Sequence, residues 1–302
     1  MQENDIINKL VILKKEKNAI ILAHNYTELK IHKIADMVGD SFQLAKAARD
    51  VTADIILFCG VKFMAETAKL LNPKAKVLLS HSEAGCPMAD MITPEDVIDF
   101  KKDHPDHIVV CYVNSSIEVK AVSDICVTSS NAVKIINTIP HYQKIFFIPD
   151  QNLGDYVRRQ TQRDITLFEG FCPIHHKKMT LLDVNTNKLM HKDHLLIVHP
   201  ECPPEIVDQA DFVGSTKELI DFAEKNDKLI IGTEMGIIDM ILDKYPNKSI
   251  IPLSSQAVCA NMKKTSLIDV LDTLQYELNE IKFTDEVFKK AFIPVSEMMK
   301  RI

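Results

Sequence analysis

Short apolar runs recur along the chain, and each run ends in polar residues. One set comprises residues 20–23, 109–111 and 195–198, which lead into His24, Tyr112 and His199. His24 and Tyr112 are 88 residues apart, and Tyr112 and His199 are 87 residues apart. Short apolar runs bounded by polar or turn residues are typical of strands in a parallel sheet. The pattern therefore predicts three equivalent strands at a nearly constant interval.

Other features of the chain repeat at the same interval. Turn motifs begin at Asp36, Asp124 and Asp211, which are 88 and 87 residues apart. Further apolar runs follow at 55–58, 145–148 and 229–231, and then at 77–79, 165–168 and 250–253. Amphipathic helical segments separate these runs, and such alternation is typical of βαβ units on a parallel sheet. The period exceeds the roughly 20–50 residues of solenoid repeats, so each repeat should be a compact domain.

These repeats predict an α/β protein with three homologous three-layer α/β/α domains around a pseudo-threefold axis. Each domain should contain a short parallel sheet of about three strands. We expect the domains to cover residues 1–83, 84–170 and 171–264. The remaining residues, 265–302, have a helical pattern, and we expect them to pack back on the first repeat.

Composition narrows the class of ligand. Hydrophobic residues make up 46% of the 302 residues and charged residues 26%, an ordinary globular balance. The net charge is −6 and no basic stripe is present, which argues against nucleic acid or an anionic membrane as partner. No apolar run approaches the ~18 residues of a membrane span, and the N-terminal segment does not resemble a signal peptide. We therefore expect a cytoplasmic protein with a small-molecule ligand.

Three of the seven cysteines follow the repeat. Cys86, Cys172 and Cys259 are 86 and 87 residues apart, and each lies in the loop after a predicted strand. In a reducing compartment such a pattern indicates metal binding or catalysis more than disulfides. Three thiolates suit a 4Fe–4S cluster with one open iron better than a four-ligand zinc site, which would need His175 or His176. Three buried thiols are the remaining alternative. The cysteines that lie within or beside apolar runs are assigned to the core: Cys59, Cys111 and Cys126.

Polar residues at matching positions provide candidate ligand contacts. Ser41, Ser129 and Thr216 lie at predicted helix starts, where free backbone N–H groups attract anions. Helix capping explains each of them alone, but three matched turns indicate a ligand with several negative groups. The strand ends add candidates for acid–base chemistry and for holding carbonyl or carboxylate oxygens: His24, Tyr26, Tyr112, Asn114, His199 and Glu201. Structural hydrogen bonding is the alternative role for each of these side chains.

Taken in order, the motifs of this chain resemble those of the quinolinate synthase family. The motifs that carry the resemblance cover nearly the whole length: AHNY (23–26), GDS (39–41), GVKFMAET (60–67), CPMA (86–89), YVNS (112–115), PDQNLG (149–154), GFCPIH (170–175), HPEC (199–202), GST (214–216) and GTEMG (232–236). As an ordered set they are highly specific.

The resemblance implies a transferase of NAD biosynthesis. Such an enzyme condenses iminoaspartate with dihydroxyacetone phosphate to give quinolinate, and it releases phosphate and two waters. The resemblance also implies a 4Fe–4S cluster held by Cys86, Cys172 and Cys259, with its fourth iron open as a Lewis acid. The residues implied to line the substrate pocket are His24, Tyr26, Ser41, Tyr112, Asn114, Ser129, His199, Glu201 and Thr216.

We expect Glu201 and Tyr26 to transfer protons, and His199 and His24 to hold carboxylate or carbonyl oxygens. Two other functions fit part of the pattern. A different iron–sulfur hydro-lyase could use the open iron on another polyanionic acid, and a zinc-stabilised domain array could sense a phosphorylated metabolite. An enzyme that supplies iminoaspartate is a candidate partner, and the sequence leaves a monomer and a homodimer equally open.

Overall fold

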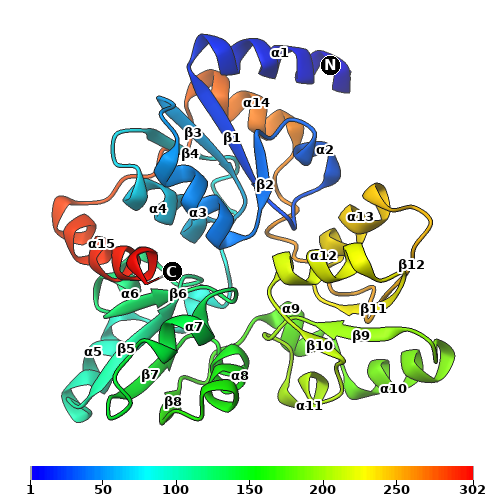
Figure 1. The fold of residues 1–302 in the computed structure, drawn as a ribbon. Helices are drawn as coiled ribbons and strands as arrows, with labels where there is room; N and C mark the ends of the chain where they lie inside the picture. The colour runs from blue at the N-terminus through cyan, green and yellow to red at the C-terminus, as the bar shows by residue number, and fades with distance from the viewer. Residues whose placement is uncertain (1, 302) are drawn as a thin grey trace.

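The structure is a computed structural model that describes residues 2–301. It contains three repeats of the same succession of helices and strands, each built around a four-stranded sheet. Figure 1 shows the three sheets as separate lobes that face a common centre. The α/β class and the three parallel sheets confirm the predicted fold class, whereas the pseudo-threefold axis itself stays a prediction.

The elements of the three repeats correspond in order. The first repeat comprises α1 (Glu3–Glu16), β1 (Ala19–His24), α2 (Leu29–His32), β2 (Met37–Gly39), α3 (Ser41–Asp50), β3 (Ile55–Cys59), α4 (Lys62–Leu71) and β4 (Lys76–Leu79). The second comprises α5 (Pro94–Asp103), β5 (His107–Tyr112), α6 (Ile117–Ala121), β6 (Ile125–Val127), α7 (Ala132–Asn137), β7 (Lys144–Ile148), α8 (Gln151–Thr161) and β8 (Ile165–Leu167).

The third repeat comprises α10 (Leu181–Met190), β9 (Leu195–Val198), α11 (Pro204–Val207), β10 (Phe212–Val213), α12 (Thr216–Lys225), β11 (Lys228–Gly232), α13 (Met235–Lys244) and β12 (Ser249–Pro252). Two short helices lie between the repeats, η1 (Ala89–Met91) and α9 (Pro173–Lys177). The chain ends with α14 (Leu267–Tyr276) and α15 (Asp285–Lys300).

All three sheets share one strand order. The orders are β2-β1-β3-β4, β6-β5-β7-β8 and β10-β9-β11-β12, with every pair parallel. Such sheets are covered by helices on both faces, so their central strands are apolar throughout. All five residues of β3 are buried, for example.

Each sheet has four strands, so the prediction of about three strands per repeat is wrong. The missed strands β2, β6 and β10 contain only three, three and two residues. Each of them directly follows the aspartate of a turn motif, so the prediction counted its residues as part of the turn. The aspartate before each of them holds it in register, because Asp36, Asp124 and Asp211 accept a hydrogen bond from a backbone N–H of β1, β5 and β9 at 2.8, 2.7 and 2.7 Å.

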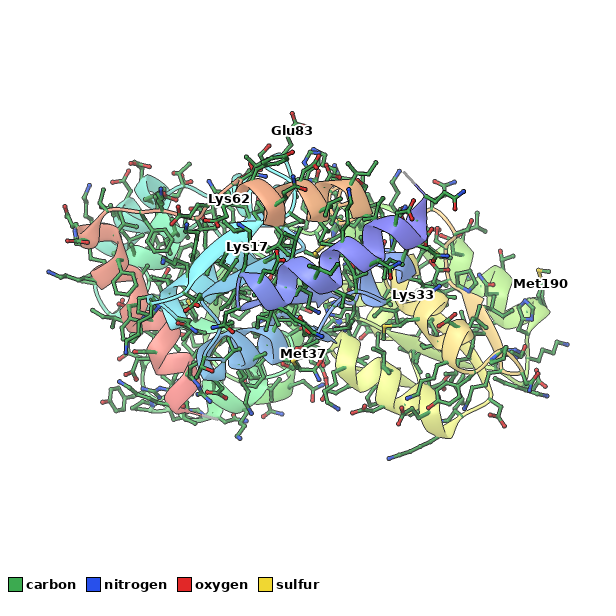
Figure 2. All side chains as sticks on the ribbon, turned by 90° about the horizontal axis from the view of Figure 1, so that it is seen from above. Lys17, Lys33, Met37, Lys62, Glu83 and Met190 are labelled. Atoms are coloured by element: carbon green, nitrogen blue, oxygen red, sulfur yellow. The ribbon has the colours of Figure 1, made fainter. Side chains whose placement is uncertain are left out.

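The two C-terminal helices join different parts of the molecule. Helix α14 packs on α1 and on β3 and β4 of the first repeat. Figure 2 shows α1 and α14 side by side on the outer face of that repeat. Helix α15 packs on α6 and β6 of the second repeat and on α4 of the first. Within residues 2–301, no helix combines the length and the apolar character needed to cross a membrane.

Candidate active site

A cavity of about 340 Å³ lies where the carboxyl ends of the three sheets meet. It is lined by every residue that was predicted to contact the substrates or the cluster: His24, Tyr26, Ser41, Cys86, Tyr112, Asn114, Ser129, Cys172, His199, Glu201, Thr216 and Cys259. Ligands of parallel α/β sheets bind at this edge of the sheet. The structure thus brings all twelve residues to one place, while their individual roles stay predictions.

The same backbone contact holds each of the three cysteine loops. In each repeat, the residue two positions before the cysteine accepts a hydrogen bond from the first backbone N–H of the helix that follows the third strand. The pairs are Lys62 N to Ala84 O at 2.8 Å, Gln151 N to Gly170 O at 2.8 Å and Met235 N to Ala257 O at 2.9 Å. Every helix start has free backbone N–H groups, so each repeat can anchor its cysteine loop with this same bond. The three thiols are therefore held at equivalent places.

Two buried carboxylates strengthen this arrangement. Asp150, the N-cap of α8, accepts a hydrogen bond from the backbone N–H of Cys172 at 3.1 Å. Glu234, the N-cap of α13, accepts one from the backbone N–H of Cys259 at 3.1 Å. Burial raises the pKa of both carboxyl groups. The sequence analysis assigned no role to either residue. Their matching positions just after the third strand of a repeat could have indicated that they are equivalent. Val61 occupies that position in the first repeat.

The cysteines of the cavity are half-buried, whereas those of the core are fully buried. Burial raises the pKa of Cys86 to about 12, and it also raises the pKa of Cys172 and Cys259. These three thiols are therefore neutral at pH 7 until a metal displaces the proton. Cys59, Cys111 and Cys126 are fully buried, which confirms their assignment to the core, and Cys202 is fully buried as well. All seven cysteines lie within residues 2–301, and none of them forms a disulfide.

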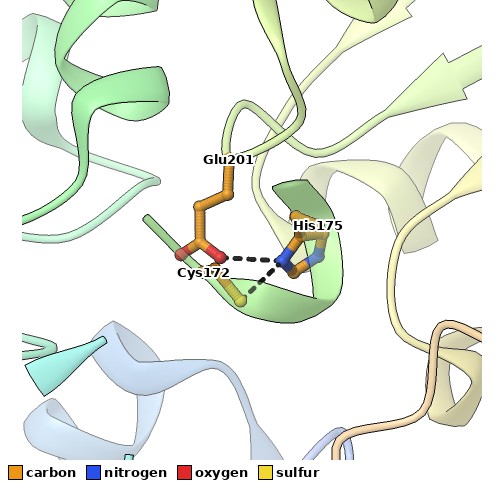
Figure 3. A group of neighbouring side chains, drawn as sticks. All are labelled: Cys172, His175 and Glu201. Carbon is orange, nitrogen blue, oxygen red and sulfur yellow. Dashed lines mark hydrogen bonds and ion pairs between the residues drawn. The ribbon is translucent and has the colours of Figure 1, made fainter. Parts of the chain in front are cut away.

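Glu201 has hydrogen-bonding partners at both of its carboxylate oxygens. Its Oε1 accepts a hydrogen bond from the Tyr112 hydroxyl at 2.7 Å, and its Oε2 lies 2.8 Å from His175 Nδ1. The same Nδ1 lies 3.3 Å from Cys172 Sγ, as Figure 3 shows. Cys172, His175 and Glu201 place three potential ligand atoms within 4.8 Å of one another, so they can hold a metal ion. The sequence indicated His175 only as an optional zinc ligand and did not reveal its contact with Glu201.

Glu201 stays ionised although it is buried. Burial by itself raises the pKa of a carboxyl group, but the contact with the His175 imidazole and the hydrogen bond from Tyr112 outweigh it and lower the pKa of Glu201. A carboxylate with lone pairs facing a cavity can accept a proton from a bound molecule.

His24 and His199 are neutral at pH 7, because burial lowers the pKa of both imidazoles to about 3. In each ring Nδ1 accepts a backbone hydrogen bond, from Tyr26 N at 3.1 Å and from Glu201 N at 3.3 Å. The ring proton therefore sits on Nε2 in both residues. These two histidines occupy equivalent positions in the first and third repeats, so each offers one N–H donor from a matched place.

Two of the three hydroxyl residues predicted to lie at helix starts do so. Ser41 and Thr216 are the first residues of α3 and α12, and the capping is done by the preceding residues, Asp40 and Ser215. The hydroxyls of Ser41 and Thr216 are thus not used as caps. Ser129 lies in the turn before α7 and not at the start of the helix itself.

Comparison with known proteins identifies the family. The profile of the family described as "Quinolinate synthetase A protein" matches residues 8–300. The chain belongs to the quinolinate synthase family. The quinolinate synthase of Caldicellulosiruptor bescii is 49% identical over 97% of both chains, and that of Alkaliphilus metalliredigens is 45% identical over 99% of both. The quinolinate synthase of Methanoregula boonei is 44% identical over 96% of both. Family membership over nearly the full length makes the chain an enzyme.

Proposed function

We propose that the chain condenses iminoaspartate with dihydroxyacetone phosphate to give quinolinate, with release of phosphate and two waters. The observation that carries the proposal is the convergence of all twelve predicted residues on one cavity between the three repeats. The names of the relatives support the same activity. The substrates bring two carboxylates and one phosphate, which suits a cavity with several uncharged donors. Because iminoaspartate is short-lived, the proposal includes an enzyme that supplies it, and it places the reaction in the cytoplasm.

We also propose that Cys86, Cys172 and Cys259 hold a 4Fe–4S cluster. The donor set supports this, because three half-buried, neutral thiols line one cavity and no other cysteine among the described residues lines it. A cluster usually takes four thiolates, so three leave one iron without a protein sulfur. When bound, such an iron supplies Lewis-acid chemistry at a departing hydroxyl group.

The protein's own side chains have distinct proposed roles. Glu201 is ionised and acts as the general base, and Tyr26 is the second proton-transfer group. His24 and His199 donate Nε2–H to carboxylate or carbonyl oxygens. Asn114 has a buried Oδ1 without a partner among the described residues, so it can accept a hydrogen bond from a substrate N–H or O–H. The anion contacts are assigned to the three remaining hydroxyls, Ser41, Ser129 and Thr216.

Product analysis and metal analysis test the proposal together. The anaerobically purified chain, supplied with iminoaspartate and dihydroxyacetone phosphate, should form quinolinate and contain iron and sulfide. Cys86→Ala, Cys172→Ala and Cys259→Ala should each lose the visible absorption of the cluster. Cys59→Ala is the matched control and should keep it, since Cys59 is fully buried outside the cavity. About one zinc per chain without iron would contradict the cluster, and a different product would contradict the reaction.

Glu201→Gln tests the general base separately. The amide keeps the size of the side chain and can still accept the Tyr112 hydrogen bond, but it cannot take up a proton. We expect turnover to fall by about 100-fold or more while the cluster spectrum is unchanged. Full activity in this variant with an intact cluster would show that another group is the base.

A further inference from the structure

We propose that an open groove on the second repeat binds helix α10 of a second copy of this chain. The groove has a volume of about 570 Å³ and is lined by side chains of η1, α5, β7 and β8 and by the turn after β8. None of its described residues lines the central cavity. It is therefore a surface separate from the candidate active site.

The first repeat shows what fills the equivalent place there. Helix α14 packs beside α1 and covers one face of β3 and β4. Leu57 of β3 is paired with Leu78 of β4 on this face, and both are 0% exposed in the apolar cluster that includes α14. In the first repeat, this position on the sheet is thus occupied by a helix with an apolar side.

The second repeat has the same position on its sheet, and the groove lies there. Phe146 of β7 corresponds to Leu57, because each pairs with the residue three positions before the end of the central strand, β5 or β1. Thr166 of β8 pairs with Phe146 and so corresponds to Leu78, but it is exposed. Phe100 of α5 stacks on Phe146 with ring centroids 3.7 Å apart. An apolar groove of this kind fits the apolar side of a helix.

Helix α10 of the third repeat is a helix of the required kind. It contains ten residues, as α14 does, and of these Val184 alone is buried. Leu182, Leu189 and Met190 are 74, 70 and 71% exposed. Leu182 and Leu189 are seven residues apart and therefore lie on the same side of the helix. Because this chain itself has an exposed apolar helix of matching length, a second copy is the occupant that the structure favours.

Charge and position also favour contact between two copies. Glu169 is exposed and is the one charged residue among the described residues that line the groove, whereas exposed Lys192 follows α10 by two positions. Figure 1 shows β8 and α10 at the end of the molecule opposite α1. A two-fold dimer formed at this end can make the contact twice, which closes the assembly and leaves neither surface free.

Analytical ultracentrifugation of the cluster-loaded chain tests the proposal. We expect the wild type to convert from monomer to dimer between about 1 and 100 µM. Thr166→Glu in the groove and Leu182→Lys on α10 should each raise the dissociation constant about tenfold or more. Both positions are exposed, so the melting temperature of the monomer should not change. A wild type that stays monomeric throughout this range would overturn the proposal and leave the groove to a helix of another protein.

A mixture of the two variants tests whether the groove and the helix contact each other. Thr166→Glu keeps an unchanged α10 and Leu182→Lys keeps an unchanged groove, so a mixed dimer has one contact without substitutions. The other contact of that dimer combines opposite charges. The mixture should therefore associate more tightly than either variant alone, and a mixture that shows no gain would contradict the contact.

Ile12→Lys is the matched control, because Ile12 is a 56% exposed apolar residue of α1 at the opposite end of the molecule. This variant should associate like the wild type. A dimer that is lost in Ile12→Lys, or that persists unchanged in Thr166→Glu, would show that a different surface forms it. Molecular mass is measured without turnover, so a chain that makes no quinolinate would contradict the proposed function and leave this result unaffected.

Discussion

At the scale of single residues, burial and neighbouring dipoles decide which groups of the cavity are charged. Burial keeps His24 and His199 neutral by lowering the pKa of each to about 3. It also raises the pKa of Asp150 and Glu234. Glu201 is the exception, because its contacts with the His175 imidazole and the Tyr112 hydroxyl stabilise the ionised form. The cavity can therefore receive an anionic ligand and still contain one carboxylate able to take up a proton.

Asp150 gives a prediction about how a cysteine loop is held. Asp150→Ala removes both the cap of α8 and the acceptor for Cys172 N–H, so the free energy of unfolding should fall by about 1–2 kcal/mol and iron per chain should decrease. Asp150→Asn should recover only part of the iron, because its single amide oxygen can replace one of the two acceptors, for Leu153 N–H or for Cys172 N–H. Denaturant unfolding and iron analysis measure the two effects.

Thr93→Ala is the control for this change. Thr93 caps α5 with the same type of hydrogen bond, to Asp96 N, and lies outside the cavity. It should cost a similar unfolding free energy with no loss of iron. Equal iron in Asp150→Ala and Thr93→Ala would mean that the carboxylate does not hold the loop.

At the scale of elements, α14 completes the core of the first repeat. Its buried residues pack in one apolar cluster with Ile6 and Leu10 of α1 and with Leu57 of β3. Leu271 is 5% exposed on the inner face of α14, and Ile268 is 58% exposed on the same helix. Leu271→Ala should lower the free energy of unfolding by about 2–5 kcal/mol. Ile268→Ala should change it by less than about 0.5 kcal/mol. Chemical denaturation of both variants tests the prediction, and equal losses would contradict it.

The end of α14 provides a pH-dependent contact. Hydrogen bonds from Lys17 and Lys76 lower the pKa of Glu277 to about 2 from its ordinary value of 4.5. A carboxyl group whose pKa is lower in the folded state stabilises the fold above its unfolded pKa. This contribution is complete above pH 4.5 and is lost as the pH falls toward 2.

Glu277→Gln should therefore be less stable than the wild type by at most about 1 kcal/mol at pH 7, because the side chains of both ion pairs of Glu277 are partly exposed to solvent. The difference should shrink as the pH falls from about 4.5 to 2, which urea unfolding of both proteins at several pH values would measure. A difference that grew on acidification would have the wrong sign for this pair.

At the scale of the whole molecule, the cavity exists only because the three repeats meet. Lys263, four residues after Cys259, connects the third repeat to the first: its Nζ donates to Tyr26 O at 2.7 Å and lies 3.4 Å from Glu234 Oε1. Lys263→Met removes this connection and leaves the carboxyl group of Glu234 without its nearest cation. We expect kcat/KM to fall about tenfold, since a hydrogen bond to a charged group contributes about 1.5–3 kcal/mol to the stability of the arrangement it holds.

The neighbouring lysine is a matched control for this experiment. Lys264 also reaches the first repeat, but its partner Glu83 is an exposed residue with a 76% exposed side chain. Solvent-exposed ion pairs contribute little to stability, so Lys264→Met should keep kcat/KM within about twofold of the wild-type value. Steady-state kinetics of Lys263→Met and Lys264→Met measures both values of kcat/KM. An equal loss in the two variants would show that burial of the Lys263 contact is unimportant.

Local patterns in the amino-acid sequence were sufficient to predict the repeat, the class of fold and the candidate residues of the site. These features follow from local periodicity, because an apolar run predicts a strand wherever it occurs and equal spacing implies equivalent places. The same reasoning placed His24, Tyr112 and His199 at matching strand ends, and the structure brings them together in the cavity.

The contacts that cross repeats depend on how distant segments of the chain pack together. Tyr26 and Thr233 are 207 residues apart and meet through a single hydroxyl, which no local pattern can signal. The same holds for the bond between His175 and Glu201 and for the position of α15 between two repeats. The short strands β2, β6 and β10 were missed because each directly follows a turn aspartate that holds it beside a neighbouring strand, and its residues were counted as part of the turn motif. Local sequence specifies the elements, whereas packing between distant segments specifies how their side chains are aligned.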